Sequence, residues 1–276
     1  MDRTLAFIGG GNMAGSLIGG LIADGWDPDS IRVADPDSVR TSRLAERFAV
    51  ITSQDNSTLI DNADAVILAV KPQVMHGVIK EIAPEINRSQ ALVISIAAGI
   101  RASTLADWLG AGTAIVRCMP NTPALVQSGA TALYASPQAS EDQRSLAESV
   151  LRAVGLTLWV DDEAQMDTVT ALSGSGPAYF FLFMEALQAA GSKLGLPADS
   201  ARLLALQTAF GAAKMALESR EDAATLRRQV TSPGGTTEQA IATFQQAGLE
   251  EIVLKAVQAA AERSRELAAE FGEENT

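Results

Sequence analysis

Cysteine, histidine and positive charge are scarce in this chain of 276 residues, and each shortage excludes a kind of site. The lone cysteine, Cys118, can form neither an intramolecular disulfide nor a metal site that needs several thiolates. Asp and Glu number 33 against 21 Lys and Arg, so the formal net charge is -12. Such an excess of negative charge disfavours nucleic acid and anionic membranes. We therefore expect no metal, no nucleic acid and no membrane partner.

Long apolar runs are absent as well. The longest ones, Ala91–Ile100 and Gly176–Met184, fall short of the ~18 residues that a membrane-spanning helix needs. The chain starts without the basic and then apolar pattern of a secretory signal. With 47% hydrophobic and 20% charged residues, the composition is typical of a globular protein with a large core. We expect a cytoplasmic protein.

The first half of the chain alternates short apolar runs with helical periodicity. The runs are apolar on both faces, as expected for strands of a parallel sheet that helices cover on both sides. They comprise Thr4–Ile8, Ile31–Ala34, Ala65–Val70 and Leu92–Ile96, and further strands are predicted at Thr113–Arg117, Thr131–Tyr134 and Leu156–Val160. Gln73–Ile86 is predicted to be a helix that crosses between two strands.

The pattern changes after about Asp162, where almost every segment becomes helical in period. The predicted helices are Met166–Gly191, Ala198–Ser219, Ala223–Val230 and Thr237–Glu270. We therefore predict an α/β fold with a doubly wound parallel sheet over residues 1–161 and an all-helical domain over residues 162–276. The stretch Tyr179–Leu187 is too apolar for a helix with a water-facing side, which predicts that the helical domain forms a homodimer.

A glycine-rich turn, Gly9-Gly10-Gly11-Asn12-Met13-Ala14, follows the first predicted strand and precedes a helix. In that context the G-x-G-x-x-A pattern indicates a dinucleotide-binding, Rossmann-like domain. The first glycine permits the tight turn, the second admits the pyrophosphate, and the alanine lets the helix pack closely on the strand. The helix N-terminus then faces the phosphate charge. An ordinary strand–helix turn is the structural alternative, and the context favours nucleotide binding.

Asp35 follows the second strand, 21 residues beyond Ala14, where an acidic residue can bond the adenine ribose. Its charge favours NADH. Arg32, Arg40 and Arg43 lie close enough in sequence to receive the 2′-phosphate of NADPH. Asp35 can equally belong to a turn with a helix cap. The residues thus leave the choice between NADPH and NADH open.

Four further segments carry a family resemblance: Ala69-Val70-Lys71-Pro72, Met119-Pro120-Asn121-Thr122-Pro123, Ser173-Gly174-Ser175-Gly176-Pro177-Ala178-Tyr179 and Ser232-Pro233-Gly234-Gly235-Thr236-Thr237. Together with the glycine turn they closely resemble pyrroline-5-carboxylate reductase, over nearly the whole chain. The resemblance implies an enzyme that reduces 1-pyrroline-5-carboxylate to L-proline with NADPH or NADH, the last step of proline biosynthesis. It also implies a helical domain that pairs two subunits, with a decamer of five dimers as a larger assembly.

The resemblance assigns residues to both ligands. Those implied to bind the nicotinamide nucleotide are Ile8, Gly9, Gly10, Gly11, Asn12, Met13, Asp35, Asn56, Ala69, Val70, Lys71, Pro72, Ala97, Ala98, Gly99 and Asn121. Those implied to bind the substrate are Glu163, Ser232, Gly234, Gly235, Thr236 and Thr237, with Thr237 as the catalytic residue.

The chemistry of the Ser232–Thr237 segment agrees with that assignment. The substrate is a small cyclic imine with a carboxylate, so its site needs an anion cradle and a donor near the imine nitrogen. Ser232–Gly235 supplies backbone N–H groups directly before a helix N-terminus, and Thr237 places a hydroxyl in the same turn. Hydride attack on an imine then depends mostly on positioning and electrostatics.

Structural alternatives exist for several of these residues. Thr236 and Gln239 match a capping box, Ser173–Pro177 suits close helix packing, and Lys71-Pro72 can simply end a strand. We expect His76 to be a surface residue and Cys118 to be a packed thiol. The acidic run at 161–163 is typical of a solvated linker, and only the family resemblance gives Glu163 a binding role.

Two rival functions fit the same architecture. A β-hydroxyacid dehydrogenase or imine reductase would carry a catalytic lysine on a helix of the second domain, and Lys193 and Lys214 are the candidates. Neither lies in the glycine-rich lysine motif of those enzymes. A nucleotide-binding scaffold without turnover would be expected to have lost the Ser232–Thr237 segment, which is intact.

Overall fold

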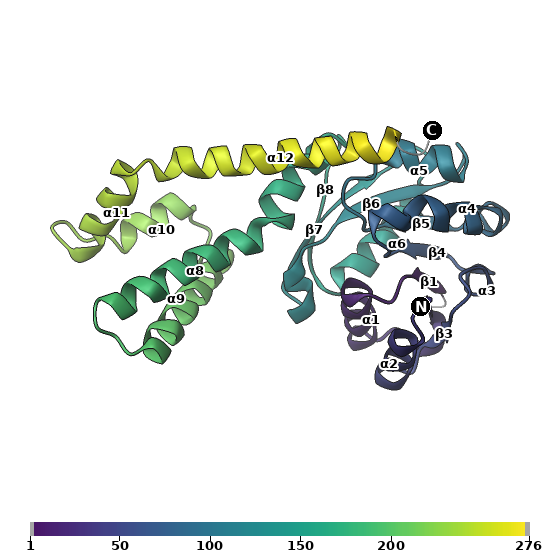
Figure 1. Cartoon of the computed structure of the whole chain (residues 1–276), viewed down its shortest axis with the longest axis horizontal. Helices are drawn as coiled ribbons and strands as arrows, with labels where there is room; N and C mark the ends of the chain where they lie inside the picture. Colours follow the sequence, from purple (N-terminus) through teal and green to yellow (C-terminus); the bar gives the residue numbers. More distant parts are fainter. Residues whose placement is uncertain (1–2, 274–276) are drawn as a thin grey trace. The chain divides into compact units, whose positions relative to one another are not determined.

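The computed structural model describes residues 3–273, whose core is a single eight-stranded sheet (Figure 1). The strands are β1 (Leu5–Ile8), β2 (Ile31–Ala34), β3 (Ile51–Ser53), β4 (Ala65–Leu68), β5 (Leu92–Ser95), β6 (Ile115–Met119), β7 (Gly129–Ala135) and β8 (Gly155–Trp159). Their order is β3-β2-β1-β4-β5-β6-β7-β8, and strands β1 to β6 are parallel. The sheet reverses at β7, which pairs antiparallel with β6 and parallel with β8.

Helices cover both faces of this sheet, as the doubly apolar strands predict. One face packs against α1 (Asn12–Ala23), α2 (Ser38–Phe48) and α6 (Glu141–Arg152). The other packs against α3 (Ser57–Ile60), α4 (Pro72–Ser89), α5 (Ala102–Leu109) and the last turns of α12 (Leu249–Glu273). Helix α4 shows why these segments are helical: Met75, Ile79, Ile82 and Ile86 are buried at three- and four-residue spacing, and Pro72 stands at the start.

The remaining elements of the described chain are helices. They comprise the 3-10 helices η1 (Pro28–Ser30) and η2 (Thr122–Val126), helix α7 (Gln165–Val169), the π-helical turn η3 (Thr170–Gly174), and helices α8 (Gly176–Lys193), α9 (Ala198–Glu218), α10 (Ala223–Gln229) and α11 (Thr236–Gln246). The predicted α/β class with a helical second part is confirmed.

Two compact units make up the structure. The first contains the chain up to Ser175 together with α12 from Ala259 onward, and the second contains Gly176–Gln258. The boundary expected between residues 161 and 162 stays a prediction. No helix in the described range is long and apolar enough to cross a membrane.

Three details differ from the sequence-based expectation. The predicted helix Thr237–Glu270 is wrong as one element, because Gly248 adopts φ +74 and separates α11 from α12. The predicted helix Met166–Gly191 contains the π-helical turn η3. The short edge strand β3 was not predicted, since its three residues are partly exposed and form no apolar run.

Candidate nucleotide and substrate sites

The glycine turn joins β1 to α1 with a backbone that suits a phosphate group. Gly9 has φ +102, and a Cβ there would lie 2.7 Å from the carbonyl oxygen of Ala69, so only glycine fits. Gly11 is the N-cap of α1, and a Cβ on it would meet nothing within 4 Å. Ala14 is 1% exposed. The turn thus leaves open space in front of the N–H groups that begin α1, as a bound pyrophosphate requires.

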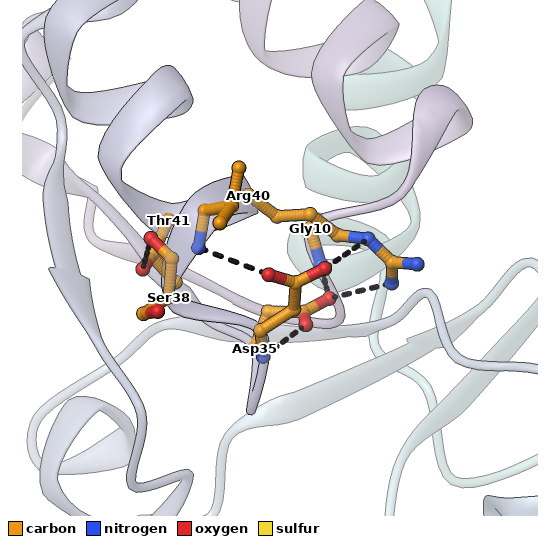
Figure 2. Close-up of polar contacts among 7 residues, drawn as sticks. Gly10, Asp35, Ser38, Arg40 and Thr41 are labelled. Carbon is orange, nitrogen blue, oxygen red and sulfur yellow. Dashed lines mark hydrogen bonds and ion pairs between the residues drawn. The ribbon is translucent and has the colours of Figure 1, made fainter.

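Asp35, at the end of β2, is buried and braces this turn (Figure 2). Its Oδ2 accepts a hydrogen bond of 2.8 Å from the Gly10 N–H, and its Oδ1 accepts one of 2.9 Å from the Asp37 N–H. The Arg40 guanidinium lies 3.4 Å from the same Oδ2 and 3.3 Å from Asp37 Oδ2. Asp35 therefore supports the glycine turn, independently of any bond to a ribose.

The three arginines near Asp35 have different surroundings. Arg32 donates to the carbonyl oxygens of Leu59 and Asp61, which turns it towards the segment before β4. Arg43 is exposed on α2. Arg40 is the arginine next to Asp35, with 55% of its side chain exposed. A 2′-phosphate near Asp35 would therefore meet Arg40 first.

The other predicted nucleotide-binding segments lie where parallel strands end. Ala69–Pro72 follows β4 and Ala97–Gly99 follows β5, so both lie at the same edge of the sheet as the glycine turn. That edge is where ligands bind in open α/β sheets. Gly99 has φ +76, and a Cβ there would lie 3.3 Å from the ring of Phe271 in α12.

Two predicted asparagines have their side chains engaged within the protein. Asn121, after β6, donates from Nδ2 to the carbonyl oxygen and the hydroxyl of Ser173, both at 3.2 Å. Its Oδ1 accepts the Ala130 N–H at 2.9 Å. Asn56 donates to Glu81 Oε1 at 3.3 Å. Asn121 thereby ties the loop after β6 to the small-residue segment before α8.

Glu163 and the Ser232–Thr237 segment, predicted together as the substrate site, belong to different compact units. Glu163 lies between β8 and α7, and its Oε1 accepts bonds from the Ala102 N–H at 2.7 Å and from Arg117 at 2.9 Å. Ser232–Gly235 joins α10 to α11 in the second unit.

The Ser232–Thr237 loop is a tight turn that feeds directly into α11. The Gly235 N–H donates to the Ser232 carbonyl oxygen at 3.0 Å, and Gly234 has φ +70. Gly235 is the N-cap, so the capping box considered for Thr236 and Gln239 does not form. Instead Glu238 reaches back, and its Oε2 accepts the Gly234 N–H at 2.8 Å. The Gly234 N–H, which is predicted to bind the substrate carboxylate, is thus hydrogen-bonded to the Glu238 carboxylate instead.

Positive charge lies close to this loop. Arg227 and Arg228 of α10 line a shallow hollow together with Thr231, Glu238 and Gln245. Thr237 is half-buried in the first turn of α11, where helical N–H groups have no helical partner. The loop therefore combines unpaired helix donors, a hydroxyl and nearby guanidinium groups, which suits a small carboxylate.

Two residues without a predicted catalytic role pack against their neighbours. Cys118 is 1% exposed, and burial raises the pKa of its thiol, so the expectation of a packed thiol is confirmed. His76 packs its ring against Trp108, with centroids 4.9 Å apart. No cluster of metal-ligating side chains occurs among residues 3–273.

The sequence motifs do not reveal two residues that contact the predicted site residues, Arg117 and Glu238. The apolar pattern places Arg117 only at the end of a predicted strand, although a charged residue in a strand buried on both faces indicates a buried ion pair. Glu238 stands three residues after the N-cap, the position from which a glutamate commonly reaches back to the preceding backbone.

Comparison with known proteins supports one family across the chain. Residues 163–267 match the family described as "Pyrroline-5-carboxylate reductase dimerisation", and residues 4–99 match "NADP oxidoreductase coenzyme F420-dependent". The pyrroline-5-carboxylate reductase of Pseudomonas aeruginosa is 52% identical over 269 residues, covering 98% of each chain. That of Pasteurella multocida is 44% identical and covers 96% of this chain and 98% of its own.

Solved structures agree with the sequence comparisons. A pyrroline-5-carboxylate reductase from Coxiella burnetii has a TM-score of 0.94 at 47% identity, covering 97% of this chain and 99% of its own. The Plasmodium falciparum enzyme, solved with NADP bound, has a TM-score of 0.85 at 29% identity and covers 97% and 98%. With a dinucleotide turn in its first unit and an intact Ser232–Thr237 loop in its second, the chain belongs to the pyrroline-5-carboxylate reductases.

Proposed function

We propose that the chain reduces 1-pyrroline-5-carboxylate to L-proline by hydride transfer from NADPH or NADH, as the last step of proline biosynthesis. The observation that carries the proposal is the Ser232–Thr237 loop, which ends in the free N–H groups and the Thr237 hydroxyl of the first turn of α11. A cytoplasmic location stays a prediction.

The first unit holds the nucleotide in this proposal. The N–H groups at the start of α1 would bind the pyrophosphate in the open space before Gly11. The backbone of Ala69–Pro72 and Ala97–Gly99, at the same edge of the sheet, would line the rest of the site, together with Asn56 and Asn121. The nicotinamide nucleotide supplies the hydride when bound, and the chain supplies the binding and orientation.

The second unit holds the substrate in this proposal. The substrate carboxylate would accept bonds from the N–H groups of Thr236 and Thr237, with Ser232 and Gly235 shaping the turn. To use the Gly234 N–H as well, it must displace the Glu238 carboxylate. The Thr237 hydroxyl would donate to the ring nitrogen, where electron density gathers as the carbon–nitrogen double bond is reduced.

The geometry near Asp35 supports use of both nucleotides. The Asp35 carboxylate already accepts two backbone N–H groups, and Arg40 lies beside it with an exposed guanidinium. An arginine at this place suits a 2′-phosphate, because its planar donors match phosphate oxygens. We propose that Arg40 is the main partner of the 2′-phosphate of NADPH and that Asp35 retains activity with NADH.

The second unit also provides the surface for assembly. Oligomerisation follows from the match to the dimerisation family over residues 163–267. The finer proposal is a homodimer formed by the exposed apolar side chains of α8, with a decamer of five dimers as the larger assembly.

Replacing Thr237 by Val tests the catalytic assignment, because valine keeps the shape and removes the donor. Loss of that bond should cost about 1–3 kcal/mol of transition-state stabilisation, which lowers kcat/KM about tenfold to a hundredfold. The dissociation constant for NADPH should stay unchanged, because the loop lies in the other unit.

The matched control is Thr243→Val on the same helix, whose hydroxyl donates to the Gln239 carbonyl oxygen and faces no proposed ligand. It should keep wild-type kcat/KM. Normal turnover in a folded Thr237→Val protein, accompanied by a lower melting temperature, would assign Thr237 a structural role only.

A further inference from the structure

The carboxylate of Glu163 joins three separate parts of the first unit. Glu163 lies between β8 and α7, and its Oε1 accepts a hydrogen bond of 2.7 Å from the N–H of Ala102, the first residue of α5. The same oxygen accepts a bond of 2.9 Å from Arg117 Nη1, which belongs to β6. One oxygen atom therefore fixes the start of α5 against the middle of β6.

Because both side chains are largely buried, loss of either partner should destabilise the folded protein. The side chain of Arg117 is 4% exposed and that of Glu163 is 19% exposed. A guanidinium held away from water needs a paired carboxylate, and removing one partner leaves the other charge buried and uncompensated. The pair thus maintains a defined geometry rather than contributing a loose surface contact.

The bond to Ala102 also completes the N-terminus of α5. Arg101 is the N-cap of this helix, and its side chain makes no capping bond. The first N–H groups of a helix need an acceptor from outside the helix, and a carboxylate suits them because of the helix dipole. Glu163 supplies that acceptor from a point 61 residues further along the chain.

The loop Ala97–Gly99, one of the segments proposed to line the nucleotide site, lies shortly before α5 in the chain. At its start the Ala97 N–H donates to the Ser95 hydroxyl at 3.4 Å. At its end, Glu163 holds Ala102, three residues after Gly99. The loop is therefore anchored on both sides, and the second anchor depends on Glu163 and Arg117.

We propose that Glu163 is a positioning residue rather than a ligand of the substrate: with Arg117 it holds the Ala97–Gly99 loop in the conformation that binds the nicotinamide nucleotide. This inference rests on the proposed function to the extent that Ala97–Gly99 lines the nucleotide site. It departs from the role that the family resemblance implied for Glu163.

Three variants of the full-length protein test the proposal: Glu163→Ala, Glu163→Gln, and the double variant Arg117→Met with Glu163→Gln. The dissociation constant for NADPH is measured by fluorescence titration without substrate. The KM for 1-pyrroline-5-carboxylate is measured at saturating NADPH. A positioning role predicts that Glu163→Ala weakens NADPH binding about tenfold while the substrate KM changes much less.

The double variant separates the two roles even if Glu163→Ala does not fold. It removes both charges and keeps an amide oxygen that can accept the Ala102 N–H. A positioning role therefore predicts an NADPH affinity close to the wild-type value. In Glu163→Gln alone the affinity should be lower, because the buried Arg117 charge stays unpaired. A substrate KM at least tenfold higher, with normal NADPH affinity in either folded variant, would make Glu163 a substrate ligand and overturn the proposal.

Unchanged constants for both ligands in a folded Glu163→Ala protein would overturn it too. Nucleotide binding is measured without turnover. A wild-type protein that fails to reduce 1-pyrroline-5-carboxylate would therefore refute the proposed function, but the NADPH dissociation constants of the variants would still test the role of Glu163.

Discussion

At the scale of single residues, Asp35 shows how one buried carboxylate supports a loop. Its two carboxylate oxygens accept the N–H groups of Gly10 and Asp37, which holds the fingerprint turn against the end of β2. Arg40 lies beside it and offsets its charge. A negative charge that is braced and partly neutralised in this way repels a 2′-phosphate less than a free one would.

Replacing Asp35 by Ser should therefore have two effects. The ratio of kcat/KM for NADPH to that for NADH should rise about tenfold, because a charge near the 2′-phosphate is removed. Affinity for both nucleotides should fall, because the Gly10 N–H loses its acceptor. Steady-state kinetics with each nucleotide measures both effects.

Three companion variants sharpen this comparison. Asp35→Asn removes the charge and keeps an acceptor, so it should raise the ratio with a smaller loss of affinity. Arg40→Met should lower the ratio, whereas the exposed Arg43→Met should not. A ratio that is constant across all four proteins would leave Asp35 as a turn residue only.

At the scale of elements, Glu148 shows how α6 is fastened to the edge strand β8. Its Oε2 accepts the Trp159 Nε1–H at 3.0 Å, and its Oε1 bonds Thr157 and Arg152. The hydrogen bond from Trp159, followed by the charge of Arg152, lowers the pKa of Glu148. The carboxylate form is thus favoured in the folded protein.

This shift predicts a specific dependence of stability on pH. A folded-state pKa below the unfolded value of about 4.3 stabilises the protein above that pH, and the contribution is lost as the pH falls through the folded-state pKa. Glu148→Gln should therefore lower the urea midpoint at pH 7 and have a smaller effect at pH 3. Glu46→Gln, on the exposed side of α2, is the control. An equal loss at both pH values would contradict the linkage.

At the scale of the whole molecule, the sheet and the edge at which the glycine turn lies could be predicted, because doubly apolar strands and the glycine turn are local signals. The contacts that shape the candidate sites could not. Arg117 and Glu163 are 46 residues apart, and the buried bond between Ser264 and Asp167 joins residues 97 apart. No periodicity reports which distant side chains pair. The motif predicts the loop at Ser232, but it does not predict the hydrogen bond from the Gly234 N–H to the Glu238 carboxylate.

Assembly is the second property that belongs to the whole molecule. Phe180, Phe181, Leu182 and Phe183 of α8 are between 45% and 67% exposed in the single chain. Four consecutive apolar residues point around the helix, so no rotation of α8 could bury all of them against one neighbour. We expect a partner subunit to cover this segment.

Light scattering at micromolar concentration should accordingly give at least a dimer. Replacing Phe180 and Phe181 together by Asp should shift the protein towards monomer, whereas Val39→Asp on α2 should not. A monomeric wild-type protein, or an unchanged oligomer in the double variant, would refute the proposed interface.

The central claim is the reaction itself, and direct detection of its product tests it. The purified protein is incubated with 1-pyrroline-5-carboxylate and NADPH or NADH, and L-proline is quantified against the nucleotide oxidised. We predict one L-proline formed for each nucleotide consumed, and no comparable oxidation of small hydroxy acids in a parallel incubation with NADP+ or NAD+. Absence of proline, or faster oxidation of a hydroxy acid than reduction of the imine, would contradict the account.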